Sequence, residues 1–349
     1  MKVKKKVISN LTKCYSIAPL YYQEKEHILV AAEKTDRCIL FDQDGNEEDT
    51  VWREPGGVMT MVQVPGTDGQ FLATHQFYSP NDAEAAQIVI VTPKRKGEWE
   101  RRVLAELPFV HRFDIINRNG VRYLIACTLK SGHSHQDDWS MPGKVYAAVL
   151  PDDLGGFSVE HQLELTVIKD HMLKNHGYYH TVDNGIETGI VCSDNGVYRF
   201  IPPASADGQW EVEQLLDVPA SDAVLVDFDE DGEKELGILS PFHGADIMIF
   251  KKVEGSYQKV YQYEKKADFL HAIYGGNLCG RPAMVVGYRK AERNLLMFTY
   301  NRERAVYEAE VIDRDCGPAN IYHFVKNGTD VLVSTNREIN QVAMYTIEA

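Results

Sequence analysis

The stretch Glu235-Leu-Gly-Ile-Leu-Ser240 decides the fold, because the chain repeats its pattern along its whole length. In this pattern a short apolar run ends in a small residue and then a polar one. It returns as Ala283-Met-Val-Val-Gly-Tyr288 and Val331-Leu-Val-Ser-Thr-Asn336, so the end points 240, 288 and 336 are spaced by 48 residues. Four earlier runs have the same form, at residues 28–33, 70–75, 123–128 and 189–193. Internal repeats of this period predict an array of similar units.

Each unit carries further strand signals around the repeated run. A turn that contains glycine precedes most of the runs, as at 117–120 and 326–328, and such turns typically join antiparallel strands. Every unit then has a third apolar strand, at 37–41, 87–91, 144–149, 196–200, 246–250, 294–298 and 341–345. Five units continue into a fourth, at 99–103, 157–163, 210–215, 257–261 and 307–311.

Four antiparallel strands per unit of roughly 40–50 residues are typical of a β-propeller blade. The seventh unit stops after three strands, and an isolated strand at residues 3–9 is available to supply the missing outer one. Pairing of these two segments would close the ring and leave only short, protected edges. We therefore predict an all-β fold in which residues 1–349 form a single seven-bladed β-propeller domain. Residues 167–173 are expected to form at most one or two helical turns.

Composition narrows the classes of function. The 37 Lys and Arg residues against 51 Asp and Glu residues give a net charge of −14, which disfavours nucleic-acid and anionic-membrane partners. The sequence contains no run of 18 apolar residues, so we expect no transmembrane helix. The N-terminal lysines are not followed by the apolar core of a signal peptide. The six cysteines are dispersed without a CxxC pair, which favours free thiols in a reducing, cytoplasmic compartment.

One loop has the spacing of a calcium-binding segment. Asp227, Asp229 and Asp231 alternate, Gly232 follows, and Glu235 adds a fourth acid. Alternate acids in a tight turn can converge on one hard cation, and glycine permits the sharp bend. The stretch resembles the FG-GAP or VCBS repeat of propeller proteins, whose DxDxDGxxE loop often holds calcium. This resemblance covers one blade and implies a structural calcium ion on the face away from an active site. A solvated acidic turn without metal is the alternative.

Histidines recur at one position of the repeat. Counting back 17 residues from the run ends 128, 193 and 288 gives His111, His176 and His271. The similar tripeptides Phe-Val-His and Phe-Leu-His end at His111 and His271. The same count from residue 33 gives Ser16 in the first unit. Because equivalent positions in a propeller lie around the central channel, we expect these histidines to meet there.

The loops after the repeated runs add polar residues to the same predicted face. A transition metal such as Mn, Zn or Fe suits neutral imidazoles, and its candidate ligands are His111, His176, His271, His135 and His243. The candidate catalytic residues are His75, His111, His176, His180, Tyr78 and Tyr288. The candidate substrate-binding residues are Gln76, Arg289, Arg337, Trp139 and Asn320. In this hypothesis the metal polarises a substrate oxygen, and a histidine removes the proton from the neighbouring C–H bond. A tyrosine protonates the leaving oxygen, and an arginine binds an anionic group of the substrate.

The seven-unit pattern with its VCBS-like fifth unit resembles the propeller of aldos-2-ulose dehydratases. In its histidine content the chain is also similar to propeller polysaccharide lyases such as oligogalacturonide lyase, in which a metal lies among histidines. These resemblances imply a metal-assisted lyase or dehydratase that performs β-elimination on a keto-sugar or uronate-type substrate, a small sugar or an oligosaccharide. Two alternatives stay open. One is a non-catalytic propeller that binds a glycan or a protein, and the other is a sugar-acid lactonase, for which an acid-rich channel mouth is expected.

Overall fold

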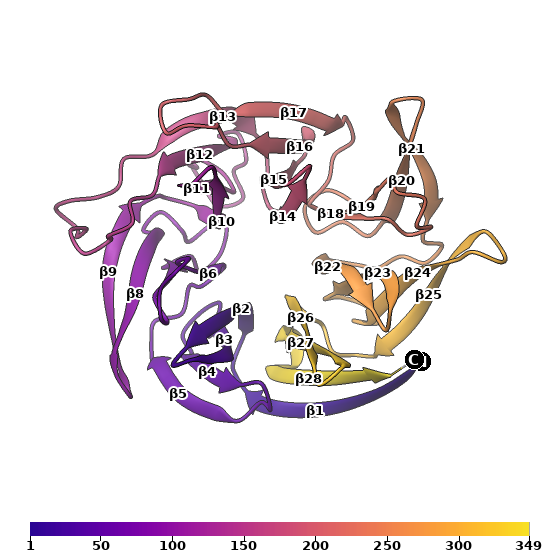
Figure 1. Cartoon of the computed structure of the whole chain (residues 1–349), viewed down its shortest axis with the longest axis horizontal. Helices are drawn as coiled ribbons and strands as arrows, with labels where there is room; N and C mark the ends of the chain where they lie inside the picture. Colours follow the sequence, from indigo (N-terminus) through magenta and orange to yellow (C-terminus); the bar gives the residue numbers. More distant parts are fainter. Residues whose placement is uncertain (349) are drawn as a thin grey trace.

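The computed structural model describes residues 1–348 as a ring of seven antiparallel, four-stranded sheets (Figure 1). The centre of this ring is called the channel below. The predicted seven-bladed β-propeller is confirmed. In six sheets the strands lie side by side in chain order, and the seventh combines both ends of the described chain. The described helical structure is one 3-10 turn, η1 (Arg337–Ile339). Within the described residues, no helix has the length and apolarity needed to cross a membrane.

The innermost strands line the channel, and the second strands carry the repeated apolar runs. The innermost strands are β2 (Cys14–Tyr22), β6 (Met61–Gln63), β10 (Val110–Arg118), β14 (Tyr178–Asp183), β18 (Asp222–Val226), β22 (Leu270–Leu278) and β26 (Ile321–Lys326). The second strands are β3 (Lys25–Ala32), β7 (Phe71–His75), β11 (Val121–Thr128), β15 (Ile186–Ser193), β19 (Glu235–Leu239), β23 (Arg281–Tyr288) and β27 (Thr329–Asn336). Both faces of a second strand are covered by adjacent blades, which is why its sequence is continuously apolar.

The outer half of each blade is progressively more polar. The third strands are β4 (Cys38–Asp42), β8 (Gln87–Arg95), β12 (Gly143–Val149), β16 (Gly196–Ile201), β20 (Ile247–Val253), β24 (Leu295–Asn301) and β28 (Gln341–Glu348). The outermost strands are β5 (Glu47–Trp52), β9 (Glu98–Glu106), β13 (Thr166–Met172), β17 (Glu211–Leu216), β21 (Ser256–Gln262), β25 (Val306–Asp313) and β1 (Lys2–Asn10).

Asparagine–glycine turns connect several inner strands, as the sequence predicts. Asn119 and Gly120 have φ angles of 51° and 82°, and Asn184 and Gly185 have φ angles of 49° and 79°. Two consecutive positive φ values fit the twist of a two-residue hairpin, and asparagine and glycine tolerate them better than other residues. These turns fix the register in which the first two strands of a blade pair.

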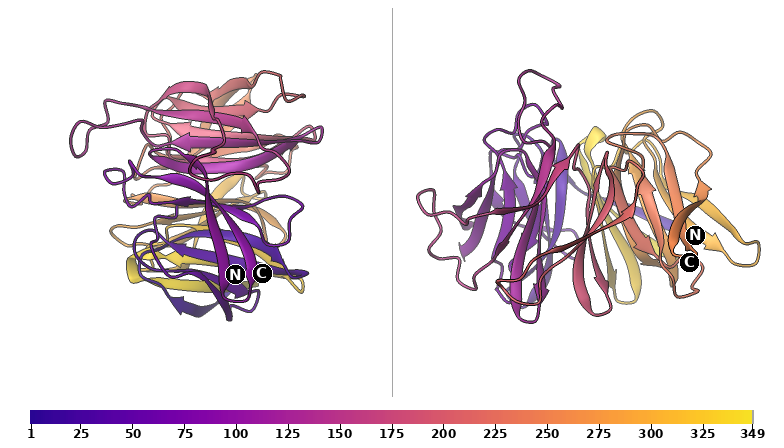
Figure 2. Two further views of the ribbon diagram at one scale, coloured as in Figure 1. Left: turned by 90° about the vertical axis from the view of Figure 1, so that its left-hand side faces the viewer. Right: turned by 90° about the horizontal axis from the view of Figure 1, so that it is seen from above.

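The two ends of the described chain close the ring. Strand β1 pairs antiparallel with β28, from Lys2 opposite Glu348 to Asn10 opposite Gln341. Both views in Figure 2 show the termini side by side at the outer edge of the ring. The prediction that the strand at residues 3–9 completes the seventh blade is confirmed.

The apolar core lies between neighbouring blades. In one cluster, Leu29 and Leu40 of the first blade pack with Phe71 and Val89 of the second, and all four side chains are buried. Comparable clusters follow around the ring. Because burial between blades supplies the stabilising contacts, the central channel is free to carry polar groups.

The outer strand of the third blade differs from the prediction. Residues 157–163 form bends and irregular chain, and β13 takes the outer position beside β12. The expected strand at 157–163 and the expected helical turns at 167–173 were therefore wrong. Phe157 and Leu163 are apolar because they pack on the neighbouring core from a loop. The sequence does not predict strand β13, because two register shifts interrupt its pairing and the alternation of its side chains.

Candidate active site

Three blades present a side chain to the channel through the same local distortion. In β2, β10 and β22 the pairing with the next strand shifts at Tyr15, His111 and His271. A residue left unpaired by a β-bulge is aimed differently from its neighbours on the strand. All three residues line one cavity. The repeated sequence thus encodes a repeated bulge that directs a polar ring inward.

The chain enters each of these bulges through a left-handed residue. Two positions before the bulge, Lys13, Phe109 and Phe269 have φ angles of 53°, 62° and 65°. The carbonyl oxygen of each accepts a backbone hydrogen bond from the first residue after the neighbouring strand. This strained but bonded conformation fixes the start of the inner strand and, with it, the direction of the bulged side chain.

The Tyr15 hydroxyl lies between the two bulged histidines. Its oxygen is 3.0 Å from Nε2 of His271 and 3.3 Å from Nε2 of His111. Burial raises the pKa of Tyr15 to about 12, so the hydroxyl keeps its proton near neutral pH. One hydroxyl hydrogen therefore faces two ring nitrogens.

The Nδ1 atoms of three histidines are held by oxygen acceptors. Nδ1–H of His271 donates to the carbonyl of Ala319 over 2.8 Å, and that of His111 donates to the carbonyl of His176 over 3.2 Å. Nδ1–H of His176 donates to a carboxylate oxygen of Asp222 over 2.9 Å. A neutral imidazole carries one proton, so each Nε2 is left as an acceptor. Tyr15 can satisfy only one of the two Nε2 atoms that it faces.

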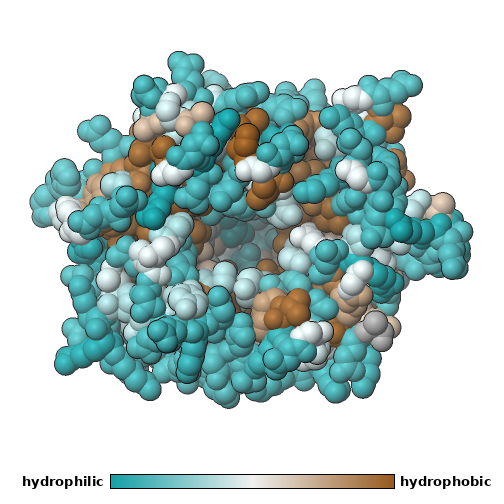
Figure 3. All heavy atoms as spheres, viewed as in Figure 1, coloured by the Kyte–Doolittle hydropathy of each residue, from teal (hydrophilic) through white to brown (hydrophobic). Residues whose placement is uncertain are grey.

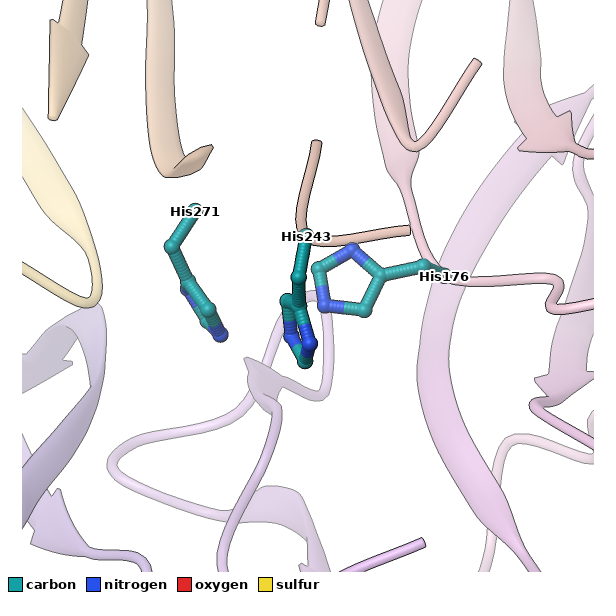
Figure 4. Close-up of side chains that lie close together, drawn as sticks. All are labelled: His176, His243 and His271. Atoms are coloured by element: carbon teal, nitrogen blue, oxygen red, sulfur yellow. The ribbon is translucent and has the colours of Figure 1, made fainter. Parts of the chain in front are cut away.

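A further lone pair points into the same space. Nε2 of His176 is buried and has no hydrogen-bond partner within residues 1–348. Nitrogen atoms of His176, His243 and His271 lie within 4.8 Å of one another, and Figure 4 shows the three rings gathered around one space. Histidine ligands characteristically present one nitrogen to a metal while the other donates to an oxygen. The donor set and the unpartnered nitrogen therefore fit a divalent transition metal.

His243 reaches the cluster from the loop between β19 and β20. Its backbone is left-handed, with φ at 59°, and its ring lies 3.7 Å from Phe242 and 3.8 Å from Phe269 between ring centroids. Burial, with the positive groups nearby, lowers the pKa of His243 to about 2. Burial also lowers the pKa of His111 and His271 well below the ordinary value. These rings are neutral at pH 7, as metal ligands or proton acceptors must be.

The histidines lie in a cavity of about 190 Å³ at the channel. Apolar side chains complete its wall, including Met59, Phe77 and Leu129. Figure 3 shows the ring face hollowed at its centre. The cavity has room for a metal ion and one small organic group, and it is smaller than the roughly 300 Å³ at which pockets for drug-sized ligands begin.

Two arginines at the cavity are already paired with acids. Arg289 donates from Nε to Glu338 over 2.8 Å, and Arg337 donates from Nη1 to the same carboxylate over 2.8 Å. Arg337 also donates to Glu33. A third cation, Lys13, lies 4.0 Å from Glu338, so three cations face two carboxylates in this network. The structure thus brings the two predicted substrate-binding arginines to the site, together with acids that the sequence interpretation did not place there.

Other predicted catalytic residues lie outside the cavity. His75 is buried within its own blade, with Nδ1 3.2 Å from the amide nitrogen of Gln87 and Nε2 3.2 Å from a guanidinium nitrogen of Arg101. The hydroxyl of Tyr288 donates to Glu292 over 3.3 Å. Both residues end second strands, where side chains face the neighbouring strands and blades rather than the channel.

The loop residues of the second and third blades are also separate from the cluster. Gln76 and Tyr78 follow β7 without lining the cavity, and His135 is exposed in the insertion of blade three. Trp139 of the same insertion packs on Phe242, with ring centroids 5.2 Å apart. Trp139 therefore supports the cavity wall from behind.

Two predicted residues lie near the channel with supporting roles. On β14, Nδ1 of His180 is 2.6 Å from a carboxylate oxygen of Asp114, and its side chain is 40% exposed. The side-chain amide of Asn320 donates to the carbonyl oxygen of Tyr15 over 2.8 Å. Asn320 thus positions the tyrosine that lies between the histidines.

Sequence reasoning missed Tyr15, although the repeat contained the signal. The count of 17 residues identifies His111 and His271 because their strands end at Thr128 and Tyr288. The equivalent strand in the first blade ends at Ala32, one residue before the run end used for the count, so the same offset leads to Tyr15.

The predicted calcium ligands lie at the opposite end of the fifth blade. Strand β18 runs from the histidine cluster toward the acid loop, residues 227–235, so the loop is on the other face of the ring. Carboxylate oxygens of Asp227, Asp229 and Glu235 lie within 4.8 Å of one another. The ammonium group of Lys251 lies among the acids and is 2.6 Å from Asp231.

No protein-family model and no curated protein matches this chain. Among solved structures, a streptogramin B lyase structure matches over 98% of this chain and 97% of that chain. The TM-score is 0.55 and the sequence identity is 14%. At this identity the likeness concerns the fold, so the chain shares its overall architecture with that lyase structure.

Proposed function

We propose that this protein is a metal-dependent carbon–oxygen lyase that performs β-elimination on a small keto-sugar or uronate-type compound. One observation carries the proposal: the histidine cluster turns Nε2 of His176 and His271 inward, ties their Nδ1 atoms to oxygens, and leaves Nε2 of His176 without a partner. Such orientation is costly unless the free lone pair has a ligand. The name of the structural neighbour, a lyase, agrees with this class of reaction.

His176, His243 and His271 would hold the metal, which fits Zn, Mn or Fe because all three ligands are imidazoles. A bound divalent metal supplies a Lewis acid that polarises a carbonyl or carboxylate oxygen and acidifies the adjacent C–H bond. Occupation of Nε2 of His271 also resolves the hydrogen bonding of Tyr15. Its single proton then has one acceptor, Nε2 of His111, 3.3 Å away.

The remaining pair, His111 and Tyr15, supplies the proton transfers. When the substrate binds, the Tyr15 hydroxyl turns from His111 to the leaving oxygen. The freed Nε2 of His111 then accepts the proton from the carbon next to the polarised group, and the electron pair of that C–H bond forms the new double bond. The C–O bond at the next carbon breaks, and the Tyr15 hydroxyl donates its proton to the departing oxygen. Tyr15 recovers a proton from His111, with which it is in hydrogen-bond contact. The products are an unsaturated compound and water or an alcohol.

The cavity and its charges limit the substrate. About 190 Å³ accommodates the reacting end of one sugar unit rather than several units of a chain. Arg289 and Arg337 keep N–H groups within reach of the cavity while Glu33 and Glu338 hold them in place. A single carboxylate or several hydroxyls would suit this network. The dispersed free cysteines fit a cytoplasmic location, and we propose no nucleic-acid or membrane partner.

The test is the metal content of purified protein, measured by elemental analysis without chelators and combined with an assay for unsaturated products from keto-sugars and uronates. We expect one transition metal per chain in the wild type and its loss in His176→Ala. His161→Ala is the matched control, because His161 is exposed and outside the cavity. Equal metal content in both variants would contradict the proposal. Absence of a transition metal and of turnover in the wild type would favour the alternative, a propeller that binds a glycan or a protein.

A further inference from the structure

The acid loop of blade five contains a cation of its own. Lys251 on β20 extends its ammonium nitrogen to 2.5 Å from Oδ2 of Asp229, 2.6 Å from Oδ2 of Asp231 and 3.1 Å from Oε1 of Glu235. An ammonium group has three N–H donors. Here it donates hydrogen bonds to Asp229 and Asp231 and lies at ion-pair distance from Glu235. The side chain of Lys251 is 22% exposed and that of Glu235 is fully buried.

A calcium ion and this ammonium group exclude each other. Calcium binds carboxylate oxygens at about 2.3–2.6 Å and needs six to eight oxygen ligands. An ion at such distances from these carboxylate oxygens would overlap the Lys251 nitrogen, and the two positive charges would repel. The loop therefore holds either the calcium ion or the ammonium group of Lys251, not the two together.

Other carboxylate oxygens of the loop accept hydrogen bonds from its backbone. Asp227 accepts hydrogen bonds from the N–H groups of Asp231 and Gly232, over 3.1 and 3.0 Å. Glu235 accepts one from the N–H of Phe228 over 2.7 Å. These bonds hold the turn in shape without an ion. Two carboxylate oxygens of the loop, Oδ1 of Asp229 and Oε1 of Glu235, are buried without a hydrogen-bond partner within residues 1–348, and two oxygens do not make up the six to eight ligands of calcium.

Cationic side chains offset part of the negative charge of the loop. Burial raises the pKa of Glu235, and burial alone would lower that of Lys251, but hydrogen bonds to Asp229, Asp231 and Glu235 raise the pKa of Lys251 overall. The lysine thus stays charged. A second cation, Arg302 of blade six, donates to the carbonyl of Asp229 over 2.9 Å and so joins the two blades.

We infer that Lys251 is the resident cation of the acid loop and that the native chain does not retain calcium there, in disagreement with the ion that the VCBS resemblance implies. The inference concerns the face opposite to the histidine cluster and is independent of the proposed lyase activity. Its test needs no substrate, because calcium binding and thermal stability report on the loop directly.

The experiment compares wild-type protein with Lys251→Met and with Lys252→Met. Methionine keeps the length of the side chain and removes the charge, and Lys252 is an exposed neighbour on the same strand. Each protein is dialysed against EDTA, titrated with calcium in a calorimeter, and melted in EDTA and in calcium. We expect no binding heat and an unchanged Tm for the wild type and for Lys252→Met. We expect Lys251→Met to bind one calcium ion and to gain about 5 °C at saturation.

Stoichiometric calcium binding by the wild type, or a rise of its Tm in calcium, would overturn the inference. A folded Lys251→Met protein that ignores calcium would also contradict it, because the acids would then not form a cation site even when the amine is removed. If Lys251→Met does not fold, the wild-type titration still decides, since it requires no variant.

Discussion

The two ends of the fifth blade handle charge in opposite ways. Where β18 begins, Asp222 fixes His176, and Nε2 of that histidine has no partner within the described residues. Where β18 ends, the acids of the loop share the ammonium group of Lys251. One region is a set of neutral bases with unused lone pairs, and the other supplies its own counter-ion. A built-in counter-ion, more than residue type, distinguishes a self-contained site from one that is open to a ligand.

The largest effect is expected at the histidine end, from Tyr15→Phe. This change removes only the hydroxyl between His111 and His271, and with it the proposed proton donor. Turnover per bound metal should fall by about 10²–10⁴-fold, the usual contribution of a positioned acid or base. Metal content should be unchanged, since Tyr15 is not a proposed ligand. Undiminished turnover would remove Tyr15 from the mechanism.

Asp222→Asn tests whether the orientation of His176 matters to the metal. The amide is a weaker acceptor for Nδ1–H than the carboxylate, so metal affinity should fall by about 10–100-fold. Competition with a chelator measures this. Asp217→Asn is the matched control, because Asp217 is exposed in the same blade connection and away from the cluster. Equal affinities in the two variants would show that Asp222 has only a structural role.

Lys251→Met tests the role of the ammonium group in the acid loop. In the presence of EDTA it leaves the buried Glu235 carboxylate without its counter-charge. We expect the free energy of unfolding to fall by about 2 kcal/mol, less than for a fully buried pair because Lys251 is partly exposed. Denaturant titration measures the loss. A change no larger than that of Lys252→Met would mean that the loop is held by its backbone hydrogen bonds alone.

The smallest effect concerns pH and His180, between the two ends. The charged groups that face this ring are Asp114 and Glu187. The hydrogen bond to Asp114 outweighs burial and raises the pKa of His180 above 6.5. A raised folded-state pKa stabilises the fold fully below the unfolded pKa of 6.5, and the contribution is lost as pH rises through the folded value.

The stability difference between wild type and His180→Gln should therefore be larger at about pH 5.5 than at about pH 8.5. Denaturant titrations at the two pH values measure it. Because the side chain is 40% exposed, solvent screening should keep the difference small. The opposite trend would mean that the His180–Asp114 contact does not favour the charged ring.

The repeats in the sequence predicted the ring, its seven blades and its closure, because continuous burial between blades leaves a plain apolar signature. The channel histidines His111, His176 and His271 were predicted by position, since one offset from the ends of the second strands leads to all three; two of them, His111 and His271, lie at a repeated bulge. Tyr15 was not, because the end of its neighbouring strand at Ala32 is set by pairing and differs by one residue from the apolar run.

Long-range partners were beyond the sequence for a different reason. The register of β20 beside β19 places Lys251 next to the acid loop. Asp222 of the fifth blade contacts His176 at the start of the neighbouring fourth blade. The motif in the loop specifies acids but not the cation that compensates them. For His75, the sequence supplied the strand end but not the direction of the side chain, which faces Arg101 of the same blade.

The closure of the ring has a consequence for synthesis on the ribosome. Strand β1 finds its partner only when β28 has emerged, and at roughly 5–20 residues per second the stretch between Asn10 and Gln341 takes roughly 20–70 s to translate. During that time β1 is a strand without a neighbour, the kind of segment that recruits other nascent chains. Lys2, Lys4, Lys5 and Lys6 crowd it with positive charge, which keeps such a strand from pairing with copies of itself.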